Sequence, residues 1–107
     1  MDIKKEAYQK AILVLKKCET PHGFFAAHPG YDAVWARDSM ITSLGASLVS
    51  QEFKQTFKNS LITLAKNQSE LGQIPNAVDI YSSRKPHVDY QTIDSTMWFI
   101  IGHYLFM

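Results

Sequence analysis

Apolar and polar residues follow a helical period in two segments of the chain and form nearly continuous apolar runs in two others. The segments at about Ile3–Cys18 and Glu52–Asn67 each carry an apolar stripe, with lysine and other polar residues on the remaining faces. This pattern predicts two amphipathic helices. The segments that begin near Asp38 and near Thr92, two candidate N-caps, are apolar or small on almost every side. They predict two helices enclosed by neighbours, the second running to about Phe106.

Glycine and proline separate these helices and define the loops between them. A loop over Thr20–Arg37 is rich in aromatic residues, which we expect to pack or stack because exposed aromatic side chains are unfavourable in water. A second loop begins at Gly72 and Pro75 and runs to about Gln91. Four helices cannot enclose two of their own number on every side. We therefore expect the start of a larger all-helical domain, or one part of an oligomer that associates through its apolar helices.

Composition narrows the class of protein. The chain has 107 residues, 46% of them apolar, and a net charge of +1, which is typical of one globular domain without the basic field of a nucleic-acid binder. Its single cysteine excludes an internal disulfide framework. The longest apolar run, Met97–Ile101, is far shorter than the roughly 20 residues that span a bilayer. His87 and Asp89 are spaced like metal ligands but have no evident third ligand. We expect a cytoplasmic chain with no nucleic-acid or membrane partner, no metal and no cofactor.

Several residues near the predicted helix starts have side chains suited to sugar chemistry. Arg37 and Asp38 would supply fixed donors and acceptors for vicinal hydroxyl groups. Taken alone, their spacing favours a simpler interpretation, a helix cap and a surface ion pair. Trp35 and Tyr31 are equally compatible with stacking on sugar rings and with core packing. Asp94 lies in the first turn of a predicted helix, where a negative charge is favoured by the helix dipole, so its position alone does not require a catalytic role.

Three motifs point beyond these alternatives. Trp35-Ala36-Arg37-Asp38 resembles the tryptophan, any residue, arginine, aspartate pattern of the six-hairpin glycosidases. Gly72-Gln73-Ile74-Pro75-Asn76 resembles a second element of that superfamily, and Asp94-Ser95-Thr96-Met97-Trp98-Phe99 a third. Their order and spacing are similar to those in the glucosidase domain of glycogen debranching enzymes (amylo-α-1,6-glucosidase). Glucoamylase-like enzymes and the alkaline/neutral invertases resemble this domain in the same respect.

The resemblance implies a fold and an activity. It implies an all-α chain whose residues 1–107 form the first two helical hairpins, about four helices, of an incomplete (α/α)6 barrel. It also implies the N-terminal fragment of an inverting glycoside hydrolase that acts on α-linked glucose in glycogen or oligosaccharides. The expected partners are the carbohydrate and either the rest of the barrel or further copies of the chain.

The resemblance also assigns roles to residues. Asp94 matches the aspartate proposed as the general acid, and the expected substrate-binding residues are Tyr31, Trp35, Arg37, Asp38 and Asn76. Weaker candidates to line the same pocket are Asp79, Tyr81, Asp89 and Tyr90.

The second carboxylate that glycoside hydrolysis usually needs is not evident. Glu52 and Glu70 fall on or after the third predicted helix, not at the start of an enclosed one. Two other interpretations therefore stay open: a non-catalytic helical module that binds carbohydrate or a protein partner, and a fragment of a neutral-invertase-like or glucoamylase-like enzyme.

Overall fold

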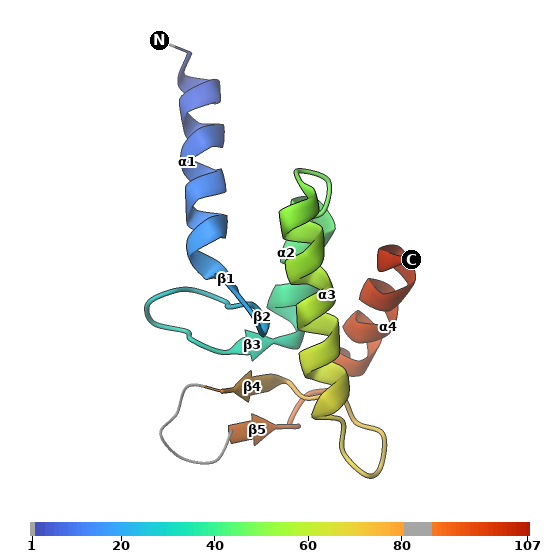
Figure 1. The fold of residues 1–107 in the computed structure, drawn as a ribbon. Helices are drawn as coiled ribbons and strands as arrows, with labels where there is room; N and C mark the ends of the chain where they lie inside the picture. Colours follow the sequence, from blue (N-terminus) through green and yellow to red (C-terminus); the bar gives the residue numbers. More distant parts are fainter. Residues whose placement is uncertain (1, 81–86) are drawn as a thin grey trace.

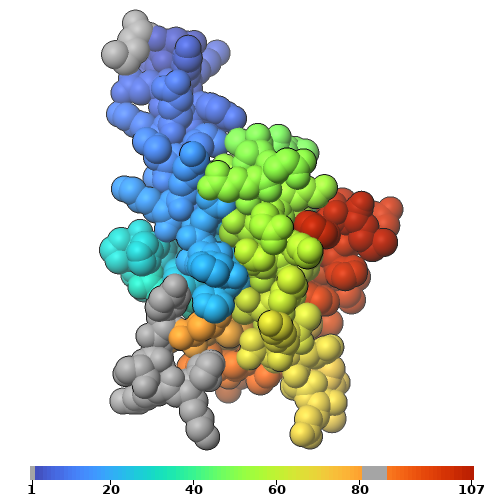
Figure 2. All heavy atoms as spheres, viewed as in Figure 1, coloured from blue at the N-terminus to red at the C-terminus, as the bar shows by residue number. Residues whose placement is uncertain are grey.

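The computed structural model describes residues 2–80 and 87–107, which form four helices and two small antiparallel sheets (Figure 1). The helices are α1 (Ile3–Cys18), α2 (Ala36–Ala46), α3 (Gln51–Lys66) and α4 (Asp94–Phe106). Strands β1 (Glu19–Thr20) and β2 (Gly23–Phe24) form one sheet, and β3 (Val34–Trp35), β4 (Ala77–Asp79) and β5 (His87–Asp89) form the other, in that order. Helices α2, α3 and α4 pack together, whereas α1 projects away from them (Figures 1 and 2).

The expectation of an all-α chain, two hairpins of an (α/α)6 barrel, is wrong for this chain because the loops between the helices contain two sheets. The reason is strand length. Each strand has only two or three residues, too few to produce a recognisable alternation of apolar and polar positions. Their pairing is also non-local, since Val34 pairs with Val78 and Trp35 with Ala77, so no local pattern records it.

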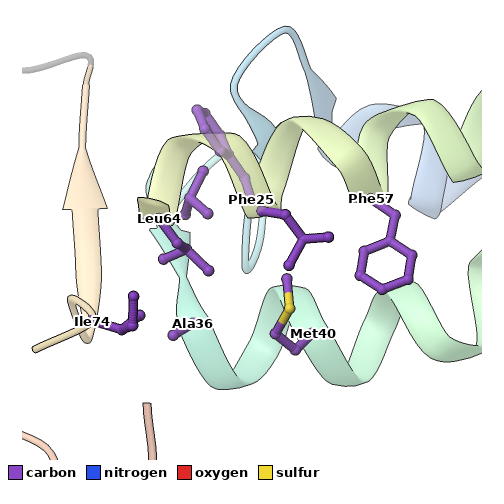
Figure 3. Close-up of a cluster of buried hydrophobic side chains, with 8 residues drawn as sticks. Phe25, Ala36, Met40, Phe57, Leu64 and Ile74 are labelled. Atoms are coloured by element: carbon purple, nitrogen blue, oxygen red, sulfur yellow. The ribbon is translucent and has the colours of Figure 1, made fainter. Parts of the chain in front are cut away.

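The expected amphipathic helix after Glu52 is confirmed in α3. Its side chain cap is Ser50, whose Oγ accepts a hydrogen bond from Phe53 N at 3.2 Å. Phe57 and Leu64 of α3 point toward Met40 and Ala36 of α2, and Ile74 closes the end of this cluster (Figure 3). A second cluster holds Ile12 and Leu15 of α1 against Phe24, Ala46 and Phe53. The expected packing of the aromatic loop is also found at Phe24 and Phe25, which are buried.

The expectation that α4 is covered on all sides is not met within the described chain. Only Ser95 and Gly102 of α4 are buried, while Met97, Ile100 and Tyr104 are 61%, 62% and 74% exposed. The helix faces α2 with its smallest residue, since a Cβ added to Gly102 would lie 2.2 Å from Met40 Sδ. The close approach of α4 to α2 thus leaves several large apolar side chains of α4 on the outside.

Both predicted N-caps are displaced by one to three residues. Helix α2 begins at Ala36, directly after Trp35, which puts Asp38 in the first turn. Helix α4 begins at Asp94, and the Thr92 hydroxyl instead contacts that of Ser95. In α2 the reason is the sheet, because Ala36 N donates to Asn76 O at 2.9 Å and so fixes the backbone where the helix starts.

Gly23 lies directly against the backbone of α3. Its φ of +126° is unfavourable for other residues, and a Cβ there would lie 2.6 Å from Ser60 Cα. The contact is held by Phe24 N, which donates to Ser60 Oγ at 2.9 Å. The β1–β2 hairpin therefore lies directly on α3.

We predict that Gly23→Ala destabilises the fold far more than Gly30→Ala. Gly30 has nearly the same φ, +128°, but no atom lies within 4 Å of its added Cβ. The control variant therefore carries the backbone strain, of order 1 kcal/mol, without the collision with α3. Urea unfolding of the two variants measures the difference. Equal losses would show that the contact with Ser60 is not tight.

We also predict that the isolated chain self-associates through α4. Met97, Ile100 and Tyr104 of this helix are more than half exposed, and monomeric proteins rarely leave large contiguous apolar patches uncovered. Sedimentation velocity across a concentration series measures the association, and Ile100→Lys together with Tyr104→Lys should reduce it. A monodisperse monomer at high concentration, with a sharp two-state unfolding transition, would contradict this prediction.

Candidate active site

The three-stranded sheet has one face on the core and one face directed away from it. Val34, Val78 and Val88 form one row across β3, β4 and β5, and the first two of these side chains are fully buried. Trp35, Ala77 and Asp89 form the adjacent row. Because successive side chains point to opposite faces of a sheet, this second row faces away from the core.

A pocket of about 490 Å³ lies on this outer face, within the size range of small-molecule sites. The sheet supplies its floor and the loop that precedes β3 supplies its wall. Tyr31 of the wall meets the indole of Trp35 edge to face, with 6.4 Å between ring centroids. Among the described residues, its lining consists of Gly30, Tyr31, Asp32, Ala33, Trp35, Ala77, Asp79, His87 and Asp89.

The Asp89 carboxylate in the pocket accepts two hydrogen bonds. Its Oδ2 accepts a hydrogen bond from Asn76 Nδ2 at 2.9 Å, and its Oδ1 accepts one from Gln91 N at 2.9 Å. The backbone is joined at the same place, because Asn76 N donates to Asp89 O at 2.6 Å. These donors, Asn76 first and then Gln91 N, lower the pKa of the Asp89 carboxyl. The pocket therefore contains a fixed, ionised acceptor at neutral pH.

The starts of α2 and α4 meet through an ion pair. Arg37 Nη1 donates to Asp94 Oδ2 at 3.2 Å, although the two residues are 57 positions apart. Their side chains are 63% and 41% exposed, so solvent and a small ligand can reach both. Arg37 follows Trp35 by two residues and Asp94 follows Asp89 by five. The sheet thus brings together the two helix starts that the sequence singles out.

The comparison with known proteins decides the family. The family model described as amylo-alpha-1,6-glucosidase matches residues 8–107. The chain belongs to this family. No curated protein and no solved structure matches the chain significantly. The expected resemblance to the glucosidase domain of glycogen debranching enzymes is therefore confirmed. Membership indicates a glucosidase-like domain with a carbohydrate substrate.

The structure distributes the expected site residues of this glucosidase-family chain over two neighbouring places. Trp35 and Tyr31 line the pocket, and Arg37 and Asp94 form the ion pair. Asn76 holds Asp89 from beside the pocket. Asp38 is exposed in the first turn of α2, and within the described residues no hydrogen bond or ion pair joins it to Arg37 or Asp94.

The weaker candidates divide similarly. Asp79 and Asp89 line the pocket, whereas the Tyr90 hydroxyl donates to Asn67 O at 2.5 Å and ties the α4-proximal loop to the end of α3. Tyr81 lies outside the described residues. Sequence reasoning missed Asp32, whose Oδ1 lies 2.7 Å from His28 Nδ1, and it considered His87 only as a metal ligand. No sequence signal marked these two residues, because strands of two or three residues show no period.

Residues 2–80 and 87–107 contain no group of three or more His, Cys, Asp or Glu side chains placed to hold a metal ion. They also contain no helix that is both long enough and apolar enough to cross a membrane.

We predict that the hydrogen bonds to the Asp89 carboxylate make the free energy of unfolding depend on pH. The Asp89 carboxyl, whose pKa is lowered by folding, stabilises the fold at pH values above its ordinary, unfolded pKa. That stabilisation is lost as the pH falls through the lowered folded pKa. Urea unfolding of the parent chain and Asp89→Asn should therefore differ at pH 7 and converge toward pH 2. A difference in unfolding free energy that persists unchanged at pH 2 would show that the Asp89 charge is not its cause.

Proposed function

We propose that this chain provides the proton-donating and sugar-holding part of an inverting α-glucosidase of the amylo-α-1,6-glucosidase type, acting on α-linked glucose. The observation that carries the proposal is the Arg37–Asp94 pair, 3.2 Å apart, in a chain of this family. The pocket beside the pair supports it, because aromatic surface combined with carboxylates suits the apolar faces and the hydroxyl groups of a sugar.

Asp94 acts in this mechanism as the general acid that protonates the leaving glycosidic oxygen. In the free chain Arg37 Nη1 donates a hydrogen bond to Asp94 Oδ2. The pair is largely exposed, however, and such pairs are weak. When sugar binds, Arg37 exchanges its hydrogen bond with Asp94 for one with a sugar hydroxyl. Asp94 is then released from Arg37 and can donate a proton to the leaving glycosidic oxygen.

The remaining expected residues hold the sugar. Trp35 and Tyr31 present aromatic surface, and Asp38, on the exposed first turn of α2, reaches a hydroxyl from the same helix start as Arg37. Asn76 acts indirectly, through the orientation of Asp89. An inverting enzyme places its two carboxyl groups about 6.5–9.5 Å apart, with a water between them. We propose that further residues of the same catalytic domain supply the base and cover the apolar outer face of α4.

A second function has one observation in its favour. In the described residues the partner of Asp94 is Arg37 and not another carboxyl group, which is also what a module that binds carbohydrate without cleaving it would show. Hydrolysis by the full product of the gene distinguishes the two. Sugar binding without release of glucose would favour the module.

We predict that Asp94→Asn lowers hydrolysis by about 10²-fold or more. The measurement is glucose release from an α-1,6-linked oligosaccharide by the full gene product, and Glu70→Gln, which removes an exposed carboxylate outside the pocket, is the control. Sugar affinity should change little because asparagine keeps the shape of the side chain.

The leaving group separates proton donation from sugar positioning. A substrate whose leaving group needs no proton, such as a glucosyl fluoride, should retain much more activity with Asp94→Asn than the natural glycoside does. Equal losses on both substrates would assign Asp94 a positioning role. No loss on either would show that Asp94 serves only the start of α4.

A further inference from the structure

The start of α4 lacks the local contacts that usually fix a helix terminus. Within the described residues no side chain makes a capping hydrogen bond to this helix. Ile93, the residue before Asp94, is 92% exposed, and the Arg37–Asp94 pair is too exposed to hold the helix by itself. The position of Asp94 therefore depends on contacts that its neighbours along the chain make with other elements.

Tyr90 makes such a contact with the end of α3. Its hydroxyl donates a hydrogen bond to Asn67 O at 2.5 Å, across 23 positions of sequence. Asn67 is the residue that ends α3, and its own side chain holds it there, because Asn67 Nδ2 donates to Thr63 O at 2.8 Å. Carbonyl groups at the end of a helix lack donors within the helix, and the phenol supplies one. Tyr90 is thus fixed relative to α3.

We propose that Tyr90 is a positioning residue for Asp94, whose hydrogen bond to the end of α3 holds the first residue of α4 where it meets Arg37. The inference rests on the proposed glucosidase function, in which Asp94 donates a proton. It adds to that function a residue that acts only through Asp94 and does not need to touch the sugar.

The segment between the two residues is short and stiff enough to transmit the constraint. Only three residues separate Tyr90 from Asp94. The segment is also hydrogen-bonded within itself, because Thr92 N donates to Tyr90 O at 2.9 Å. The Thr92 hydroxyl contacts that of Ser95, which is buried in the first turn of α4. A displacement of Tyr90 would therefore move this turn and would not be absorbed in a loose loop.

Helix α3 is a suitable reference because it also packs against the helix that carries Arg37. Buried side chains of α2 and α3 belong to one core cluster. Arg37 is placed by α2, and Asp94 is placed against α3 through Tyr90, so both members of the pair are set by the same packed unit. A second tether, from Ile74 N to Thr96 Oγ1 at 3.2 Å, holds α4 just after Asp94. Tyr90 supplies the corresponding tether just before it.

Tyr90→Phe tests the proposal because it removes the hydroxyl and keeps the ring. The measurements are kcat and KM of the full gene product for an α-1,6-linked oligosaccharide and for glucosyl fluoride, whose leaving group needs no proton. We expect kcat for the oligosaccharide to fall roughly 10-fold or more, because a reacting group misplaced by about 1 Å can cost 10²-fold. KM should stay nearly unchanged, and the loss on glucosyl fluoride should be much smaller. The control Tyr8→Phe removes an exposed hydroxyl of α1 and should change neither.

A double variant separates positioning from a general structural role, with circular dichroism as the check on folding. Tyr90→Phe added to Asp94→Asn should lower kcat for the oligosaccharide no further, because the side chain that it positions is already lost. Equal losses on both substrates, a loss confined to KM, or an effect that adds to that of Asp94→Asn would overturn the proposal.

A measurement without hydrolysis distinguishes this proposal from the proposed function. NMR resonances of the Arg37 guanidinium in this chain report on the ion pair, and Asp94→Asn shows how they shift when the carboxylate is lost. Tyr90→Phe should shift them in the same direction, and Tyr8→Phe should not. This shift, without hydrolysis that depends on Asp94, would support the placement of Asp94 by Tyr90 and remove the glucosidase activity. Hydrolysis that depends on Asp94 but not on Tyr90 would leave the activity and overturn the positioning role.

Discussion

The rest of the structure depends on the backbone pairing between β3 and β4, which joins two loops that are far apart in the sequence. Val34 and Trp35 pair with Val78 and Ala77, and Ala36 N continues the pairing to Asn76 O at 2.9 Å. This pairing fixes where α2 begins. Through β5 and the bond from Asn76 N to Asp89 O, it also fixes the segment that leads into α4. The core packs α4 against α2, and the strand pairing sets the residue at which each of the two helices is entered.

How much of the fold was predictable differs from element to element, for physical reasons. Helix α3 was predicted well because its apolar stripe, with Phe53, Phe57 and Leu64, records directly which face is buried. The strands were not, since two or three residues carry no period and their stability comes from distant partners. The apolar pattern of α4 correctly indicated a helix but not its surroundings. Hydropathy reports what a side chain prefers and not which neighbour satisfies it, so the exposure of Ile100 and Tyr104 could not be anticipated.

The same distinction applies to the candidate site. Sequence motifs could single out Arg37 and Asp94 because Arg37 is the second residue of α2 and Asp94 is the first residue of α4. The structure brings the two side chains together. The pocket acids could not be assembled in the same way. His87 reaches the pocket only through its pairing with Asp79, in a sheet that the sequence does not announce. Asp89 likewise gains its role from Asn76, a contact that depends on the pairing of β4 with β5.

Trp35 is at once the last residue of β3, the residue before α2 and part of the pocket floor. Trp35 therefore belongs to the strand and Arg37 to the helix of one strand-to-helix junction, with only Ala36 between them. Each residue inserted at this junction would turn α2 by about 100° about its axis relative to the sheet. Arg37 would then rotate away from Asp94 even though every side chain of the site was retained. The number of residues between Trp35 and Arg37 thus sets the direction in which the Arg37 side chain points. An insertion or deletion there would damage the site more than most substitutions.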